Sequence, residues 1–149
     1  IVIAALGPRM LELAGELTRG AIPYNVTPEH TAEARRRLGP GKMLAVEQKF
    51  CLSTDDGAAL ELARKELSRY MAMPNYRNNW LRLGFSEADL ADGGNKRFLN
   101  AMVVWGTQAT IEARMQEHYD AGADHVCVQP VHRAGDLDEA KAMVEALAP

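Results

Sequence analysis

The sequence predicts an α/β fold built on a parallel sheet, and three observations carry that prediction. Residues 1–6 (IVIAAL) form a short, fully apolar run, the pattern of a parallel strand buried on both faces. Gly7-Pro8 ends the run, and from Met10 onward apolar residues recur at helical spacing. Strand and helix patterns then alternate four times along the chain, which implies a parallel sheet.

The first unit is predicted to be a strand, a tight loop, a helix and a second strand, which together make a βαβ crossover. Pro8 suits the first turn of a helix because it has no N–H to donate and a fixed φ. Gly20 allows the turn into the second strand, which ends at residues 24–27. The loop would place a helix N-terminus at the carboxyl edge of the sheet, where such folds bind anions.

Capping residues and helix breakers set the limits of the remaining elements. In chain order we expect a helix over 27–38, a strand over 43–53, a helix over 54–71, a short helix over 86–92, a helix over 98–105, a helix over 107–119, a strand over 125–130 and a helix over 137–147. No linker or repeat divides these elements, so residues 1–149 are predicted to form a single domain.

Residues 74–95 interrupt the alternation. Pro74 ends the preceding helix, and residues 75–85 (NYRNNWLRLGF) are both aromatic-rich and polar. The segment is too long for a plain connector, which favours a lid or a helical insertion. Its aromatic side chains would either pack the insertion onto the scaffold or face a ligand.

Polar residues in the strand over 43–53 need either partners or a cavity, because an internal strand is buried. Glu47, Gln48 and Lys49 lie in the middle of this strand. One interpretation is a salt-bridged strand end. The other is that Gln48 or Lys49 faces a pocket.

Composition excludes several classes of protein. The net charge of −3 argues against a nucleic-acid or acidic-membrane partner. No apolar run is long enough for a transmembrane helix, and no segment has the pattern of a signal peptide. Cys51 and Cys127 have no second Cys or His at metal spacing, so no metal site is predicted. Both thiols are predicted to be small buried hydrophobes in a reducing cytoplasm. His30 and His118 are expected on helix surfaces.

Three segments resemble a known family. Residues 4–15 (AALGPRMLELAG) resemble a segment of bacterial luciferase-like monooxygenases, most closely the branch that uses the deazaflavin coenzyme F-420. Residues 75–85 are similar to an actinobacterial subgroup of that branch. Gly106-Thr107 and residues 120–126 (DAGADHV) resemble the closing helix and the last barrel strand of the family. The resemblance spans essentially the whole chain but only the C-terminal half of the family.

The resemblance implies a TIM (β/α)8 barrel, of which this chain would supply the last four βα units. Such barrels need about 250 residues, whereas this chain has 149. The chain also begins without Met and inside a predicted strand, which agrees with a C-terminal half-barrel fragment. A half-barrel exposes sheet edges and an apolar face, so we expect it to pair with the missing N-terminal half or with a second copy in a homodimer.

The resemblance also implies a coenzyme site on the carboxyl face of the barrel. Carried over by position, the residues that would contact the coenzyme are Ala5, Leu6, Gly7, Pro8, Met10, Leu11, Tyr24, Asn25, Val26 and Thr27. The family residues that bind the deazaflavin ring lie largely in the N-terminal half, so no catalytic residue is assigned here. His132 and Arg133 follow the last strand and would either meet an anionic substrate or lie in an exposed loop.

The function implied is that of an F-420-dependent oxidoreductase, which transfers a hydride between the deazaflavin coenzyme and an unknown small organic substrate. One alternative keeps the barrel and replaces the coenzyme with FMN, as in flavin-dependent monooxygenases of the same family. A second alternative is a half-barrel without catalysis that serves as an assembly or phosphate-binding module. A doubly wound nucleotide-binding domain is disfavoured because no G-x-G-x-x-G follows the first strand.

Overall fold

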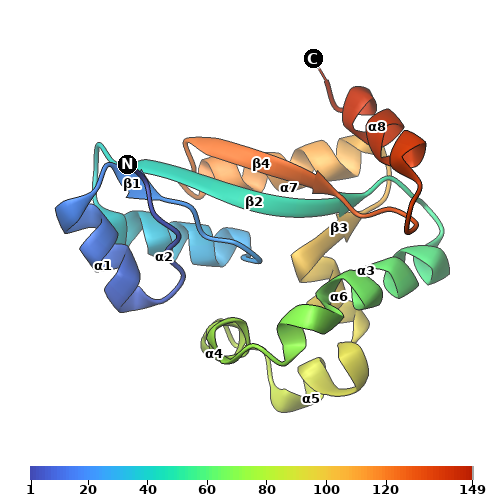
Figure 1. The fold of residues 1–149 in the computed structure, drawn as a ribbon, viewed down its shortest axis with the longest axis horizontal. Coiled ribbons are helices and arrows are strands. Elements are labelled where there is room, and N and C mark those ends of the chain that lie inside the picture. The colour runs from blue at the N-terminus through green and yellow to red at the C-terminus, as the bar shows by residue number, and fades with distance from the viewer. Residues whose placement is uncertain (149) are drawn as a thin grey trace.

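A four-stranded parallel sheet organises the chain in the computed structural model, which describes residues 1–148 (Figure 1). The longest strand, β2 (Met43–Cys51), lies at its centre. On one edge β2 pairs with β4 (His125–Pro130) over six residues, from Ala45↔His125 to Phe50↔Pro130. On its other edge β2 pairs with β1 (Gly20–Ala21) near its start and with β3 (Val103–Trp105) at its end. Every pairing is parallel, as the alternation of elements predicted.

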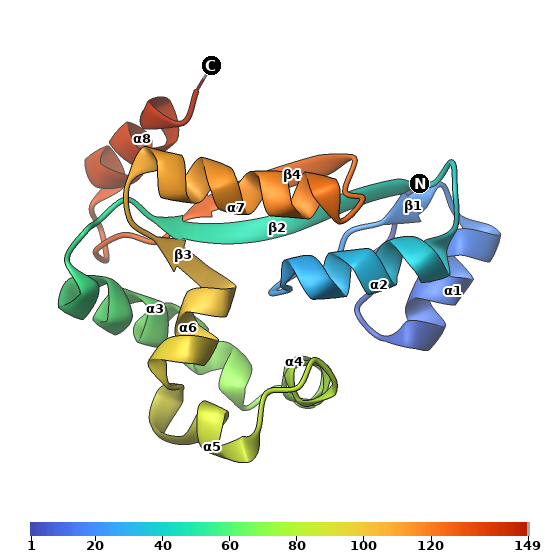
Figure 2. The same cartoon turned by 180° about the vertical axis from the view of Figure 1, so that it is seen from behind.

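Helices cover one face of the sheet, and a second group of helices lies beyond one of its edges. Their bounds are α1 Pro8–Leu17, α2 Pro28–Leu38, α3 Asp56–Met71, α4 Pro74–Arg82, α5 Glu87–Leu90, the 3₁₀ turn η1 Ala91–Gly93, α6 Lys96–Met102, α7 Gln108–Asp120 and α8 Leu137–Ala146. Figure 2 shows α2 and α7 lying across one face of the sheet. Helices α3 to α6 gather beyond the edge that carries β3, so the predicted insertion over 74–95 is helical.

Two apolar clusters hold these layers together. One lies between α1, α2 and the sheet, where Ala14 and Ala34 are fully buried. The helices approach so closely there that a Cβ on Gly15 would lie 2.6 Å from the carbonyl oxygen of Leu38. The other cluster joins the carboxyl end of β2 to the insertion, with Trp80 and Phe98 fully buried and their ring centroids 4.8 Å apart. The aromatic side chains of the insertion therefore pack it onto the scaffold.

Local capping chemistry places the helix starts where the sequence predicted them. Thr27, Asp55 and Thr107 each accept a backbone N–H at the start of the following helix. Asn95 caps α6 in the same way, and α6 therefore begins two residues before its predicted start at 98. Ser86 forms a reciprocal capping box at the start of α5. The predicted limits of α2, α3 and α7 are correct to within about two residues, because these signals depend on neighbours in the sequence.

Residues 1–6 do not form the strand that their apolar pattern predicted. Ile3 makes one isolated parallel bridge to Ala21, and Ile1 is 93% exposed. Among residues 1–148, β1 is the only strand that pairs with this segment, and a two-residue strand offers few backbone partners. Gly20 also has a different role from the one expected. It lies within β1, and a Cβ there would be 2.0 Å from the carbonyl oxygen of Met43, so close strand approach excludes any side chain.

Four further expectations are wrong. The helix predicted over 98–105 ends at Met102, and residues 103–105 form β3 because the edge of β2 offers backbone partners. Cys127 is exposed, since it pairs with Glu47 on the sheet face that α2 and α7 do not cover. His30 and His118 are both buried rather than on helix surfaces, because α2 and α7 turn these residues toward the sheet.

Within residues 1–148, no helix combines the length and apolarity needed to span a membrane.

Candidate functional site

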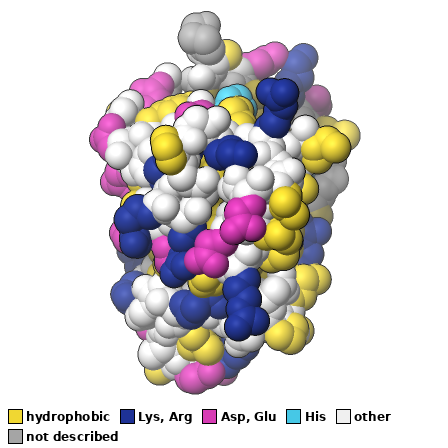
Figure 3. Space-filling view, turned by 90° about the vertical axis from the view of Figure 1, so that its left-hand side faces the viewer, with side chains coloured by type: hydrophobic (Ala, Val, Ile, Leu, Met, Phe, Trp, Pro, Cys, Tyr) yellow, Lys and Arg dark blue, Asp and Glu magenta, His cyan; other side chains and the backbone are white. Residues whose placement is uncertain are grey.

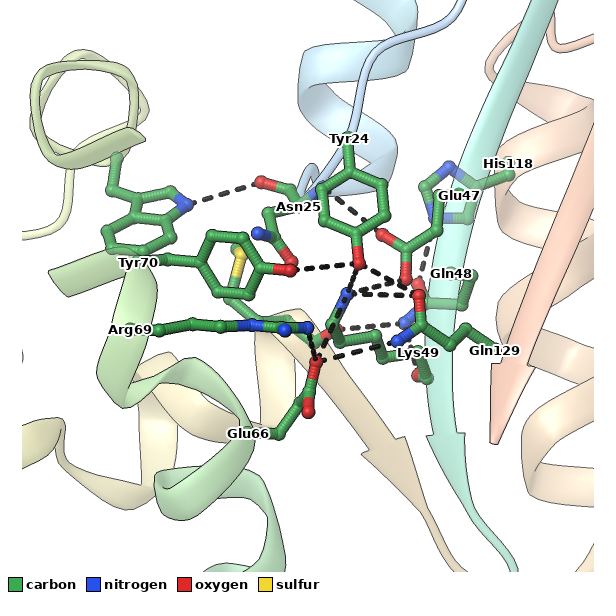
Figure 4. Close-up of polar contacts among 12 residues, drawn as sticks. Tyr24, Asn25, Glu47, Gln48, Lys49, Glu66, Arg69, Tyr70, His118 and Gln129 are labelled. Carbon is green, nitrogen blue, oxygen red and sulfur yellow. Dashed lines mark hydrogen bonds and ion pairs between the residues drawn. The ribbon is translucent and has the colours of Figure 1, made fainter. Parts of the chain in front are cut away.

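A buried lysine lies at the centre of a polar cluster where β2, β4, α3 and the segment after β1 meet (Figure 4). Lys49 is fully buried, and its Nζ lies 2.6 Å from the Tyr24 hydroxyl, 2.9 Å from Glu47 Oε1 and 3.5 Å from Gln129 Oε1. Glu66 Oε1, on α3, is 3.9 Å away. A buried ammonium group is stable only with such partners, because desolvation of a charge is expensive.

The alternation of side chains along β2 creates this cluster. Glu47 and Lys49 point to one face, where their register partners on β4 are Cys127 and Gln129. Gln48 points to the other face, and its Oε1 lies 2.9 Å from His118 Nε2 on α7. All three polar side chains in the middle of the strand therefore have partners, and the salt bridge between Lys49 and Glu47 lies in the strand interior rather than at its end.

The electrostatics of the cluster follow from burial. Burial raises the pKa of Glu47, and the Lys49 ammonium partly offsets this effect. The backbone N–H of Asn25 donates to Glu47 Oε2 at 3.1 Å. Burial also raises the pKa of Tyr24, and it raises the pKa of Tyr70 to about 12. Both tyrosines therefore remain protonated hydrogen-bonding groups at neutral pH.

Aromatic side chains connect the cluster to the insertion. The Tyr24 and Tyr70 hydroxyl oxygens lie 3.1 Å apart, and the Tyr70 and Tyr76 rings pack edge to face at 5.1 Å. Tyr76 in turn stacks on Trp80 at 6.1 Å, and Trp80 Nε1 donates to the carbonyl oxygen of Asn25 at 3.2 Å. α3 and α4 are thus tied to the segment that follows β1.

A cavity of about 280 Å³ opens beside this aromatic group, at the start of α1. Ten residues line it: Ala4, Ala5, Leu6, Gly7, Met10, Ile22, Pro23, Tyr24, Asn75 and Tyr76. Five of these are residues for which the resemblance implies coenzyme contact, namely Ala5, Leu6, Gly7, Met10 and Tyr24. The fold therefore brings the loop after residues 1–6 and the segment after β1 to one cavity. The second strand was predicted to continue to residues 24–27, but β1 ends at Ala21.

The other five residues of the implied coenzyme set lie around this cavity without lining it. Pro8 begins α1, directly after the cavity loop. Leu11 and Val26 pack in the apolar cluster under α1 and α2, and Thr27 caps α2. Asn25 has a left-handed backbone with φ of 56° and is almost fully buried. Its side-chain amide has no hydrogen-bond partner among residues 1–148.

The start of α1 is suited to an anion. Gly7 is the N-cap residue and has no side chain that could cap the helix. Pro8 has no N–H, but the backbone N–H groups that follow it in the first turn are left without a side-chain acceptor. A Cβ built on Gly7 would lie 3.9 Å from Arg82 Nη2, and that guanidinium is held by Asn79 Oδ1 at 2.8 Å. A helix N-terminus and an arginine thus converge on one loop. Sequence reasoning did not assign Arg82, Asn75 or Tyr76 to the site, although residues 75–85 stood out as aromatic and polar.

His132 and Arg133 lie apart from this cavity. His132 lines a different cavity of about 370 Å³, together with Lys65, Arg69 and Gln129. Arg133 pairs with Glu139 at 3.2 Å and lines a third cavity of about 590 Å³. Within residues 1–148, no group of three or more His, Cys, Asp or Glu side chains is arranged to hold a metal ion.

Comparison with known proteins identifies the fold. No family model matches the chain, and no curated protein sequence matches it. Among solved structures it is similar to an F-420-dependent secondary alcohol dehydrogenase in complex with an F-420–acetone adduct, with a TM-score of 0.64 and 14% identity over 99% of this chain and 48% of that chain. It is also similar to the coenzyme F-420-dependent tetrahydromethanopterin reductase from Methanopyrus kandleri, with a TM-score of 0.61 and 18% identity over 96% of this chain and 48% of that one. A third similar structure is apo-MsnO8, with a TM-score of 0.61 and 17% identity over 99% of this chain and 51% of that one.

These matches confirm the predicted fold class. The chain has the α/β architecture of luciferase-like TIM barrels and spans about half the length of the solved structures it matches. Identities of 14% to 18% establish a common fold and no more.

Proposed function

We propose that this chain is the C-terminal half of an F-420-dependent oxidoreductase of the luciferase-like type. The observation that carries the proposal is the cavity at the start of α1, which joins Ala5, Leu6 and Gly7 to Tyr24 in a fold shared with F-420-dependent enzymes. When bound, the coenzyme would supply hydride transfer between its deazaflavin C5 and a small organic substrate.

The residues present fit one part of such a coenzyme. A cavity of about 280 Å³ is too small for a whole dinucleotide-sized molecule and large enough for a phosphate and its neighbours. The uncapped start of α1 and the Arg82 guanidinium would hold the phosphate, and Met10 and Tyr24 would contact the groups beside it. The deazaflavin ring would then lie beyond this cavity, against the other half of the barrel.

Exposed apolar side chains support the proposal that the chain is covered in the complete protein. Ile1 and Leu17 are 93% and 74% exposed, and Met10, Leu13 and Ile22 are each exposed by more than a third. Figure 3 shows hydrophobic side chains gathered along the right-hand edge of this side of the molecule. Patches of this kind mark interaction surfaces, so we propose that the N-terminal half of the barrel, or a second copy of the chain, covers them.

Coenzyme titration tests the function directly. Purified protein would be titrated with F-420 and, separately, with FMN, and binding would be followed by quenching of coenzyme fluorescence. We expect F-420 to bind and binding to weaken with increasing ionic strength, because a phosphate contact is electrostatic. Preference for FMN would favour the flavin-dependent alternative. Binding of neither coenzyme, together with a concentration-dependent dimer, would favour the assembly module.

A Gly7→Asp variant locates the site. A carboxylate at the N-cap would occupy the start of α1 and repel a phosphate there, while it caps the helix favourably. We expect coenzyme affinity to fall at least tenfold with no loss of folding stability. Gly57→Asp, at the start of α3 and away from the cavity, is the matched control and should leave affinity unchanged.

A further inference from the structure

The Tyr24 hydroxyl carries its full complement of hydrogen bonds. A tyrosine hydroxyl donates one hydrogen bond and accepts two. Lys49 Nζ can only donate, and it lies 2.6 Å from the Tyr24 oxygen. Tyr24 donates to Gln129 Oε1 at 2.8 Å, so Tyr70, at 3.1 Å, must be the second donor to Tyr24. No capacity remains for a ligand at this oxygen, which means that the hydroxyl holds the ring in place rather than reacting.

The same ring forms part of the cavity wall. Tyr24 lines the cavity together with Asn75 and Tyr76 of α4, and the Tyr24 and Tyr76 ring centroids are 6.4 Å apart. The Lys49 ammonium lies 3.9 Å from the centroid of the Tyr24 ring, close enough for a cation–π contact. Figure 4 shows Lys49 below Tyr24, with Glu47 and Gln129 on one side of it and Tyr70 on the other. Lys49 thus contacts Tyr24 at both its hydroxyl and its ring.

The orientation of Lys49 is itself determined by other residues. Glu47 Oε1 and Gln129 Oε1 accept from its remaining N–H groups. Glu47 lies two residues before Lys49 on β2, and Gln129 is the register partner of Lys49 on β4. Glu66 is shared between Arg69 at 3.0 Å and Lys49 at 3.9 Å. The two carboxylates, Glu47 and Glu66, therefore balance the charges of Lys49 and Arg69. An arrangement this constrained in a buried site indicates a role in positioning.

We infer that Lys49 is a positioning residue for the coenzyme cavity. It fixes the Tyr24 ring as one wall of the cavity. Through Tyr70, whose hydroxyl bonds to Tyr24 and whose ring packs against Tyr76, it also holds the start of α4 against the same cavity. The inference that this shape serves the coenzyme rests on the proposed function. The mechanical part, that Lys49 ties α4 to the sheet through Tyr24, stands without it.

The first experiment measures hydrogen exchange without ligand. The variant is E47Q/K49M, which removes both charges so that neither is left buried alone, and the amide introduced by E47Q can still accept from the Asn25 backbone N–H. We expect backbone amides in α4 to exchange about tenfold faster than in the native protein. The matched control is Q48M, which removes a buried polar contact from the opposite face of β2 and should leave α4 unchanged. Unchanged exchange in α4 for E47Q/K49M would overturn the inference.

The second experiment measures F-420 affinity in a double-mutant cycle. Y24F keeps the ring and removes the tether, so Y24F and E47Q/K49M should each weaken binding about tenfold, and the triple variant should be no weaker than either. Y119F, on an exposed tyrosine of α7, is the control and should bind like the native protein. Additive losses, or no loss, would overturn the link between Lys49 and the cavity. If the native protein binds no F-420, the proposed function fails, and the exchange experiment still decides whether Lys49 fixes α4.

Discussion

Two charged clusters lie at different points along the strands, one beside the amino ends of β2 and β4 and one farther along β2, and they differ in what they hold. At the amino edge Arg35 donates to the backbone carbonyl oxygens of Gly39, Lys42 and Gly122, at 2.8 to 3.1 Å, and to Asp124 Oδ2 at 2.6 Å. The Lys49 cluster has side chains as partners at almost every position. Arg35 therefore joins loops, whereas Lys49 orders buried side chains, one of which, Tyr24, lines the cavity at the start of α1.

Exposure separates the clusters as well. The side chains of Arg35 and Asp124 are 23% and 49% exposed, while those of Lys49 and Glu47 are 0% and 7% exposed. Solvent screens the first pair and leaves the second in a low-dielectric interior. In TIM barrels the amino face serves stability and the carboxyl face carries function. The contrast between the two clusters agrees with that division, and the following predictions test it.

Removing Lys49 alone should have the largest effect on stability. Lys49→Met leaves the Glu47 carboxylate buried next to an apolar side chain, and breaking such a pair costs about 3–5 kcal/mol. Urea denaturation would measure the loss, and E47Q/K49M should recover a large part of it because no charge is then left unpaired. A Lys49→Met variant as stable as the native protein would show that Glu47 is already neutral in the folded state.

The next largest effect concerns His118, on the face of β2 opposite Lys49. Burial lowers its pKa from 6.5 to about 4, and Gln48 and Thr31 hold the neutral ring between them at 2.9 Å each. The pKa of His118 is lower in the folded state than in the unfolded chain, so the unfolded chain takes up this proton first as the pH falls. The free energy of unfolding is therefore unaffected by His118 protonation above pH 6.5 and decreases as the pH falls toward 4. The loss should be about 3 kcal/mol. Urea denaturation of the native protein and of His118→Gln across this range would show it as a difference in slope. Parallel curves would contradict it.

How much of this architecture the sequence predicts depends on the distance between partners along the chain. Thr27 and Ser86 cap their helices through bonds to backbone groups three residues away, and those predictions are confirmed. β2 and β4 were also predicted, because their apolar runs are long enough to show the pattern of buried strands. The parallel order of the sheet followed from alternation alone.

The candidate site could not be predicted in the same way. Lys49 meets Tyr24 and Gln129 from 25 and 80 positions away, and His118 meets Gln48 from 70 positions away. Neither helical periodicity nor composition encodes such contacts, so His118 was wrongly expected on a surface. The segment over 1–6 shows the converse error. Its pattern is that of a strand, but a strand also needs a neighbour long enough to pair with, and Ile3 makes only one bridge, to the two-residue strand β1, among the described residues.

Removing Arg35 should have a smaller effect than removing Lys49. Arg35→Met deletes charge-assisted hydrogen bonds to three carbonyl groups and Asp124, yet these partners lie near solvent and can bind water. We expect a loss of about 2 kcal/mol in urea denaturation. F-420 affinity should not change, since Arg35 and Asp124 lie beside the amino ends of the strands and do not line the cavity at the start of α1. A change in affinity would show that the amino edge influences the site and would remove the contrast between the two clusters.

The smallest expected effect is the coupling between Arg35 and Asp124. Asp124 Oδ2 also accepts from the backbone N–H of Leu44 at 2.8 Å, so the carboxylate stays anchored when the arginine is removed. A cycle of R35M, D124N and the double variant should give a coupling free energy of about 0.5–1 kcal/mol that shrinks in 1 M salt, because the pair is partly exposed. The same cycle for Glu47 and Lys49 should give a larger value that salt hardly changes. Equal salt sensitivity at both pairs would mean that water reaches Lys49, and that the buried cluster is no drier than the amino edge.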